Sequence, residues 1–148
     1  MQFRILRDTA RPDLRAILGQ AKRPEVLLRA IGVGVVSLTK QAFNDPAKRP
    51  NAWPVKADGE AATLKDTSTL WRSVRVVSAD GTRVVVGSDR KYAAVHQMGS
   101  KAKRGAMGKI PRRAYLPFTN RGALTAEGQR MVQRTVNAWW RARGRAGG

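Results

Sequence analysis

Two short valine-rich runs separated by a turn constrain the fold of this chain more than any other feature. Within residues 74–79, Val74, Val76 and Ser78 alternate with Arg75, Val77 and Ala79, and three valines at residues 84–86 follow Asp80-Gly81. An Asp-Gly pair between such runs is typical of a tight β-hairpin turn, because Gly accepts positive φ and Asp tolerates it. Valine on both faces predicts that parts of both are covered, one by the core and one by a helix or another subunit.

A long helix is predicted before the hairpin. Pro24 can occupy its first turn, and the pattern runs to about Asn44. Six apolar side chains fall close to one stripe: Leu27, Leu28, Ile31, Val35, Leu38 and Phe43. Gly32 and Gly34 each cost a helix about 1 kcal/mol relative to Ala. We therefore expect a neighbour to approach this helix closely there, or the helix to bend.

Shorter patterns complete the chain. We expect an opening strand at residues 2–6, a helix from Pro12 to about Gly19, a helix at residues 63–73 and a short helix or turn at residues 91–98. A strand is predicted at residues 114–118, and a C-terminal helix begins at Thr125. The class is α+β: a small antiparallel sheet with a central hairpin, packed against the long N-terminal-half helix and the C-terminal helix.

Two connections have distinct compositions. The Pro- and Lys-rich residues 46–59 contain Trp53, which we expect to fix this loop to the core. Residues 99–109 are rich in Gly, Ser and Ala, and they predict a mobile basic loop. The end of the chain, at about residues 144–148, is expected to be frayed.

Composition limits the class of protein. A chain of 148 residues with 42% hydrophobic residues predicts one domain, residues 1–148, with a core. There is no cysteine, and neither a signal-peptide pattern nor an apolar run of the roughly 20 residues that span a bilayer. We expect a soluble protein without a membrane partner.

The positive charge is extreme. Lys and Arg number 29 against 10 Asp and Glu, for a net charge of +19. The charge occurs in the N-terminal quarter, from the basic loop to Arg113, and in the last helix. It favours either acidic protein neighbours or sequence-independent DNA binding. No helix-turn-helix, zinc-finger or RNA-binding motif is present.

Patterns of catalytic residues are almost absent. His96 is the sole histidine, so the usual zinc ligand sets are not available, and a structural role is favoured. Serines are present for a Ser-His-Asp arrangement, but no motif frames them. Asp58 and Glu60 form the one close acidic pair and are expected to be solvated. The Gly32-Val33-Gly34 pattern lacks the context of a nucleotide-binding loop.

Five pieces, in this order, resemble one protein family. They are Trp53 after a Pro-rich loop; Leu64-Lys65 followed by Thr69-Leu70-Trp71-Arg72-Ser73-Val74; Val84-Val85-Val86-Gly87-Ser88; Tyr92-Ala93-Ala94-Val95-His96-Gln97-Met98-Gly99; and Ile110-Pro111-Arg112-Arg113-Ala114-Tyr115-Leu116. The chain resembles the phage virion morphogenesis family, the tail completion proteins of Mu-like and related tailed phages. It departs from the family pattern at Thr69 and at Ala114-Tyr115.

The resemblance implies a structural virion protein, without enzymatic activity or cofactor. Such a protein completes the tail top or neck as a subunit of a ring, expected to be a hexamer, and joins the tail to the DNA-filled head. Expected partners are its own copies, neighbouring tail and neck or connector proteins, and packaged DNA. The expected location is the head-tail junction of the virion, after assembly in the host cytoplasm. The alternative function is a free, sequence-nonspecific DNA-binding protein.

Three sets of residues are the candidate sites. For contact with a partner or DNA they are Lys101, Lys103, Arg104, Lys109, Arg112 and Arg113. For subunit interfaces they are Val77, Val85, Trp139 and Trp140. The structural residues of the family motifs are Trp53, Leu70, Trp71, Tyr92, His96, Gly99, Pro111 and Tyr115.

Overall fold

The computed structural model describes residues 12–64, 69–100 and 110–146, so the predicted opening strand and most of the basic loop lie outside the described residues. The elements are α1 (Pro12–Gln20), α2 (Pro24–Asn44), the 3-10 turn η1 (Pro46–Lys48), α3 (Thr69–Ser73), β1 (Arg75–Ala79), β2 (Val84–Gly87), α4 (Ala93–Met98) and α5 (Ala126–Ala146). Five helices and a two-stranded antiparallel sheet in the described residues confirm the α+β class.

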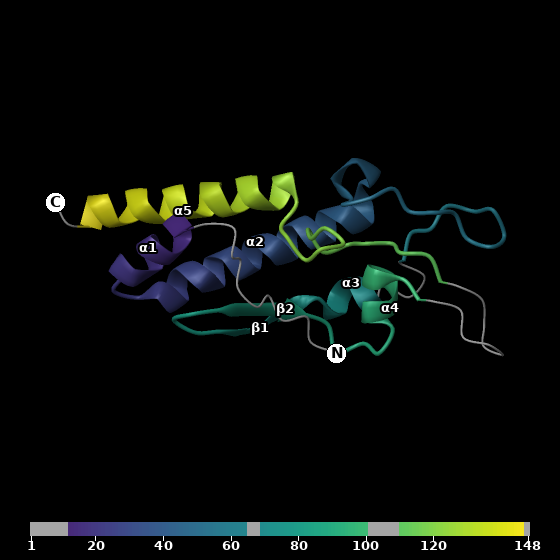
Figure 1. The fold of residues 1–148 in the computed structure, drawn as a ribbon, viewed down its shortest axis with the longest axis horizontal. Coiled ribbons are helices and arrows are strands. Elements are labelled where there is room, and N and C mark those ends of the chain that lie inside the picture. The colour runs from purple at the N-terminus through teal and green to yellow at the C-terminus, as the bar shows by residue number, and fades with distance from the viewer. Residues whose placement is uncertain (1–11, 65–68, 101–109, 147–148) are drawn as a thin grey trace.

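Helix α2 is the centre of the fold. It packs against α5 on one side and against the β1-β2 hairpin on another (Figure 1). Every side chain of the predicted apolar stripe is buried. By length and composition α2 is also apolar enough to cross a membrane, but half of its most apolar window is buried inside this fold. The stripe therefore serves as the core of the domain.

The two glycines of α2 are contact points. A Cβ atom at Gly32 would lie 2.6 Å from Cγ2 of Val84 in the hairpin, and one at Gly34 would collide with Sδ of Met131 in α5. The expected close approach to this helix is thus confirmed. Because the two glycines face different neighbours, the missing side chains let both the hairpin and α5 approach the backbone of α2.

The hairpin was predicted correctly, but its turn was not. Strands β1 and β2 pair antiparallel with an irregularity between Val76 and Ser78. The Asp80 N–H donates to the Arg83 carbonyl at 2.9 Å, which places Gly81 and Thr82 at the centre of the turn. Gly81 does not have positive φ. Oδ1 of Asp80 accepts the Thr82 and Arg83 N–H groups, and these donors help lower the pKa of Asp80 to about 2.

Two other boundaries differ from the predictions. The helix expected at residues 63–73 is helical only over α3 in the described chain, and Leu64 has φ 55°, outside the helical range. Residues 114–118 are irregular apart from one isolated bridge between Phe118 and Leu124. Helix α5 continues to Ala146, so residues 144–146 are helical, and fraying of the chain end at about residues 144–148 stays a prediction.

Candidate functional site

Residues 112–116 are not paired with a strand in the described chain, and side chains accept several of their backbone N–H groups instead. Oε1 of Gln97, which is buried in α4, accepts the N–H groups of both Tyr115 and Leu116 at 3.0 Å. From the other direction, Oδ1 of Asn51 accepts the Ala114 N–H at 3.1 Å. These bonds satisfy backbone groups that a strand would have paired in a sheet. The predicted strand is wrong for this reason.

An aromatic cluster packs around the same segment. Trp53 is buried, and its Nε1 donates to the Ala114 carbonyl at 2.8 Å, so the prediction that it fixes its loop to the core is confirmed. Phe43 lies between Trp53 and Tyr115, with ring centroids 5.9 Å and 5.3 Å away. The Tyr115 hydroxyl donates to the Ala93 carbonyl at 2.8 Å, and burial raises its pKa.

The two arginines at the end of the basic loop point into the fold. Arg113 is buried, and its guanidinium donates to the carbonyls of Pro54 and Val55, both at 2.9 Å. Arg112 is half-buried and donates to Asn51 and to the Phe118 carbonyl. The sequence placed both among the residues for contact with a partner or DNA. Their donors are used within the same chain, and Arg113 is buried; contact of either arginine with a partner or DNA stays a prediction.

The ends of the basic loop are joined. The Ser100 N–H donates to the Ile110 carbonyl at 2.9 Å, and the Ile110 N–H donates to Oγ of Ser100 at 3.1 Å. Gly99 has φ 75°, and a Cβ there would lie 3.0 Å from the backbone nitrogen of Arg112. Glycine is therefore required at this position, whereas Pro111 is half-buried. Lys101, Lys103, Arg104 and Lys109 lie outside the described residues.

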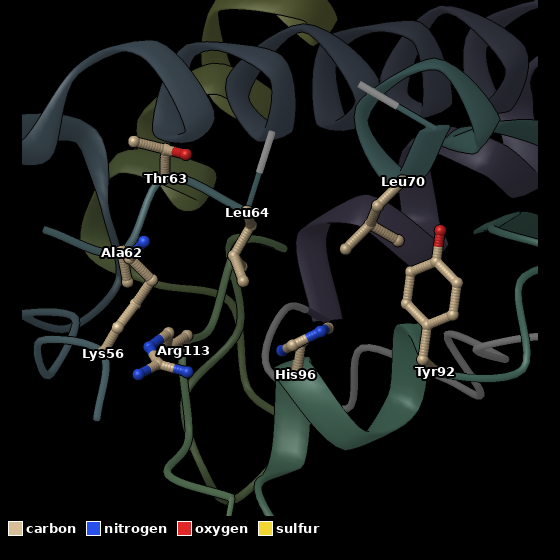
Figure 2. Close-up of a pocket in the computed structure, with 8 residues that line it drawn as sticks. All are labelled: Lys56, Ala62, Thr63, Leu64, Leu70, Tyr92, His96 and Arg113. Atoms are coloured by element: carbon tan, nitrogen blue, oxygen red, sulfur yellow. The ribbon is translucent and has the colours of Figure 1, made fainter. Parts of the chain in front are cut away.

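A cavity of about 380 Å³ opens between α3, α4 and the loop after η1 (Figure 2). Its walls include Leu70 from α3, Tyr92 and His96 at α4, and the basic side chains Lys56 and Arg113. Leu64, with its left-handed backbone, also contributes to the wall. The cavity is mixed in character, because apolar side chains and the cations Lys56 and Arg113 both line it.

The chemistry available in the cavity is limited. His96 is half-buried and lies edge-on to Tyr92, and burial followed by the nearby Arg113 charge lowers its pKa. Its Nδ1 has no partner among the described residues. Lys56 forms ion pairs with Asp58 and Glu60. No group of three potential metal ligands occurs in the described part of the chain.

The predicted serines do not join His96. Oγ of Ser73 and Oγ of Ser88 lie 2.6 Å apart in a buried pair, and Ser73 also donates to the Leu70 carbonyl. Ser78 is exposed on β1. The arrangement favours a structural role for the serines and for Leu70, which is buried at the start of this helix.

The predicted interface residues are divided between the core and the surface. Val85 is buried within the fold of the single chain, whereas Val77 is exposed at the irregularity of β1. Trp139 packs against the core under the Arg143 guanidinium, while its neighbour Trp140 is half exposed. Trp71 is partly buried, with the Lys40 ammonium 5.0 Å from its ring centroid. The structure thus leaves Val77 and Trp140 accessible and covers Val85.

Sequence reasoning missed Asn51 and Gln97, the two amides that bind the segment. Neither belongs to a recognisable catalytic or binding pattern. The one available signal is that an apolar segment ending in a proline, residues 114–117, lacks an obvious strand partner and must find acceptors elsewhere. That signal does not say which side chain supplies them.

Known proteins share parts of this sequence. Over 93 residues the chain is 34% identical to the Mu-like prophage FluMu G protein 2 of Haemophilus influenzae, an alignment that covers 63% of this chain and 65% of that protein. The chain thus spans about two thirds of the length of this curated relative. No solved structure matches it. The model of the phage virion morphogenesis family matches residues 8–140, nearly the whole chain. The protein therefore belongs to the phage virion morphogenesis family.

Proposed function

We propose that this protein is a ring subunit that completes the tail top or neck of a phage particle and joins the tail to the DNA-filled head. Family membership supports a structural role in the virion. The observation that supports a ring is an exposed apolar stripe on α2, the helix whose other sides form the core of the domain. A closed ring requires each subunit to present two different complementary surfaces.

The first surface is the outer side of α2. Val26, Ala30 and Val33 recur at i, i+4 and i+7, which places them on one side of the helix. All three are exposed, and Val33 is 58% exposed. Single exposed valines are common, but a row of apolar residues on a core helix is typical of a covered interface.

The second surface lies around α4. Tyr92 and Met98, at the two ends of this short helix, are both large and exposed. Helix α4 lies well away from the start of α2 (Figure 1). Two separate apolar surfaces suit a head-to-tail contact in which α2 of one subunit meets the α4 region of the next.

Native mass spectrometry of the purified protein tests the contact. We expect a ring in the wild type, and only monomer in Val33→Asp, because a buried unpaired carboxylate opposes association. Val55→Asp is the matched control, since Val55 is 60% exposed but lies in a loop outside both surfaces. Loss of the ring in both variants, or in neither, would contradict the interface.

Deletion of the gene from its phage or prophage tests the role. Electron microscopy of the lysate should show full heads beside unattached or overlong tails. Complementation with the wild type should restore joined particles, and complementation with the Val33→Asp variant should not. Normal virions from the deletion strain would rule out a joining function.

A further inference from the structure

Four arginines form a row along the outer side of α5. Arg130, Arg134, Arg141 and Arg145 recur at i, i+4, i+11 and i+15, spacings that return to one side of an α-helix. All four are exposed. They span about 22 Å at a rise of about 1.5 Å per residue. Val132 and Val136, on the opposite side of the helix, are buried. We call these four residues the arginine row.

The charge of the arginine row is poorly neutralised. Glu127 is the sole acidic residue of α5, and its carboxylate lies 2.7 Å from Nη2 of Arg130 and 3.7 Å from Nη2 of Arg134. Among the described residues, no carboxylate forms an ion pair with Arg141 or Arg145. The C-terminal part of the row therefore presents uncompensated guanidinium groups in a chain that already carries a net charge of +19.

The surroundings of the row decide between three kinds of anionic partner. An anionic membrane would need the apolar side of α5 to be free, but that side packs against α2. A protein interface would need large apolar side chains at its centre, whereas the residues between the arginines on this side are the exposed and small Asn137 and Ala138. A folded acidic protein would also have to match four fixed guanidinium positions.

A nucleic acid backbone meets these conditions. Each DNA strand carries one phosphate per about 3.4 Å of helix axis, so about six phosphates lie along the 22 Å row, and contact is possible in any register. Arginine binds phosphate oxygens through paired donors. We propose that the arginine row of α5 binds the phosphate backbone of duplex DNA without reading its sequence. The inference does not depend on the head-tail role, because it concerns naked duplex.

The test compares two variants with equal loss of charge. Arg134→Gln/Arg141→Gln/Arg145→Gln removes three members of the row. Arg29→Gln/Arg72→Gln/Lys91→Gln removes three exposed cations outside α5 that have no carboxylate partner among the described residues. Fluorescence anisotropy with a mixed-sequence duplex gives the affinity at several NaCl concentrations, and circular dichroism confirms that each variant is folded.

We expect the row variant to bind more weakly than the wild type. The slope of log affinity against log salt should be smaller in magnitude by about 2.7, since three phosphate contacts are lost and each contributes about 0.9. The control should reduce the slope by less than about 1. Equal losses in both variants, or no binding by the wild type, would overturn the proposal. Polyglutamate is the second probe and stands for an acidic protein. If the wild type binds polyglutamate as tightly as duplex DNA, and the row variant loses that binding, the row would be a site for an acidic protein and the proposal would be overturned.

Discussion

At the scale of single residues, Gln97 supports a whole segment of the backbone with one side chain. One side-chain oxygen accepts two buried backbone N–H groups, those of Tyr115 and Leu116. Gln97→Leu would leave both without an acceptor, at about 1–3 kcal/mol for each orphaned group. Urea unfolding should therefore show a loss of several kcal/mol. Gln41→Leu, an exposed glutamine on α2, should change the stability by less than about 0.5 kcal/mol. Similar losses in the two variants would contradict this role.

His96 should make stability depend on pH. Burial lowers its pKa below the ordinary value of 6.5, so the folded state resists the proton that the unfolded state accepts. The stabilisation is complete above the unfolded pKa and is lost as the pH falls below it. Between about pH 7.5 and about pH 5.5, we expect the melting temperature of His96→Gln to fall less than that of the wild type. Equal slopes in the variant and the wild type would show that other groups cause the dependence.

At the scale of elements, the two glycines of α2 should respond differently to the same substitution. Gly32→Ala meets Val84, a stiff β-branched side chain, and overpacking of this kind costs about 1–3 kcal/mol. Gly34→Ala meets the flexible end of Met131, which can move, so the gain in helix propensity offsets more of the strain.

Gly19→Ala in α1 is the control, because nothing lies within 4 Å of the added Cβ and stability should rise. Thermal unfolding of the three variants should give the order Gly19→Ala, then Gly34→Ala, then Gly32→Ala, from most to least stable. A Gly32→Ala variant as stable as the wild type would mean that the hairpin does not press on α2.

Local sequence patterns predicted the helices and strands whose signals lie within the element, and they failed where the hydrogen-bond partners are far away in the sequence. Helix α2 was found with its observed ends because its apolar stripe and Pro24 are local signals. The strand at residues 114–118 was wrong because its backbone partners are side chains, and one of them, Asn51, is 63 residues away. The turn centre shifted because the Asp80 carboxylate, not a positive φ at Gly81, closes it. For the candidate site, Trp53 was predicted, but the burial of Arg113 was not, since its acceptors are carbonyls of a distant loop.

At the scale of the whole molecule, a net charge of +19 opposes the folded state, because folding brings like charges together. Salt screens this repulsion. The melting temperature should therefore rise from about 50 to about 500 mM NaCl. The row variant and its charge-matched control should both show a smaller rise than the wild type, since stability depends on total charge rather than on one surface. A melting temperature that falls with salt would mean that the surface ion pairs outweigh the repulsion.

The hydrogen bonds between Ser100 and Ile110 identify a position at which foreign sequence can be inserted into the protein. Ser100 and Ile110, which flank the nine residues 101–109, are hydrogen-bonded to each other, so the number of residues between them does not set the position of any described element. Doubling that number should cost only about 0.6 kcal/mol of closure entropy. The same insertion after Gly87, where the chain is buried, should unfold the domain. A peptide tag placed between Ser100 and Ile110 would therefore label the protein without disturbing its fold.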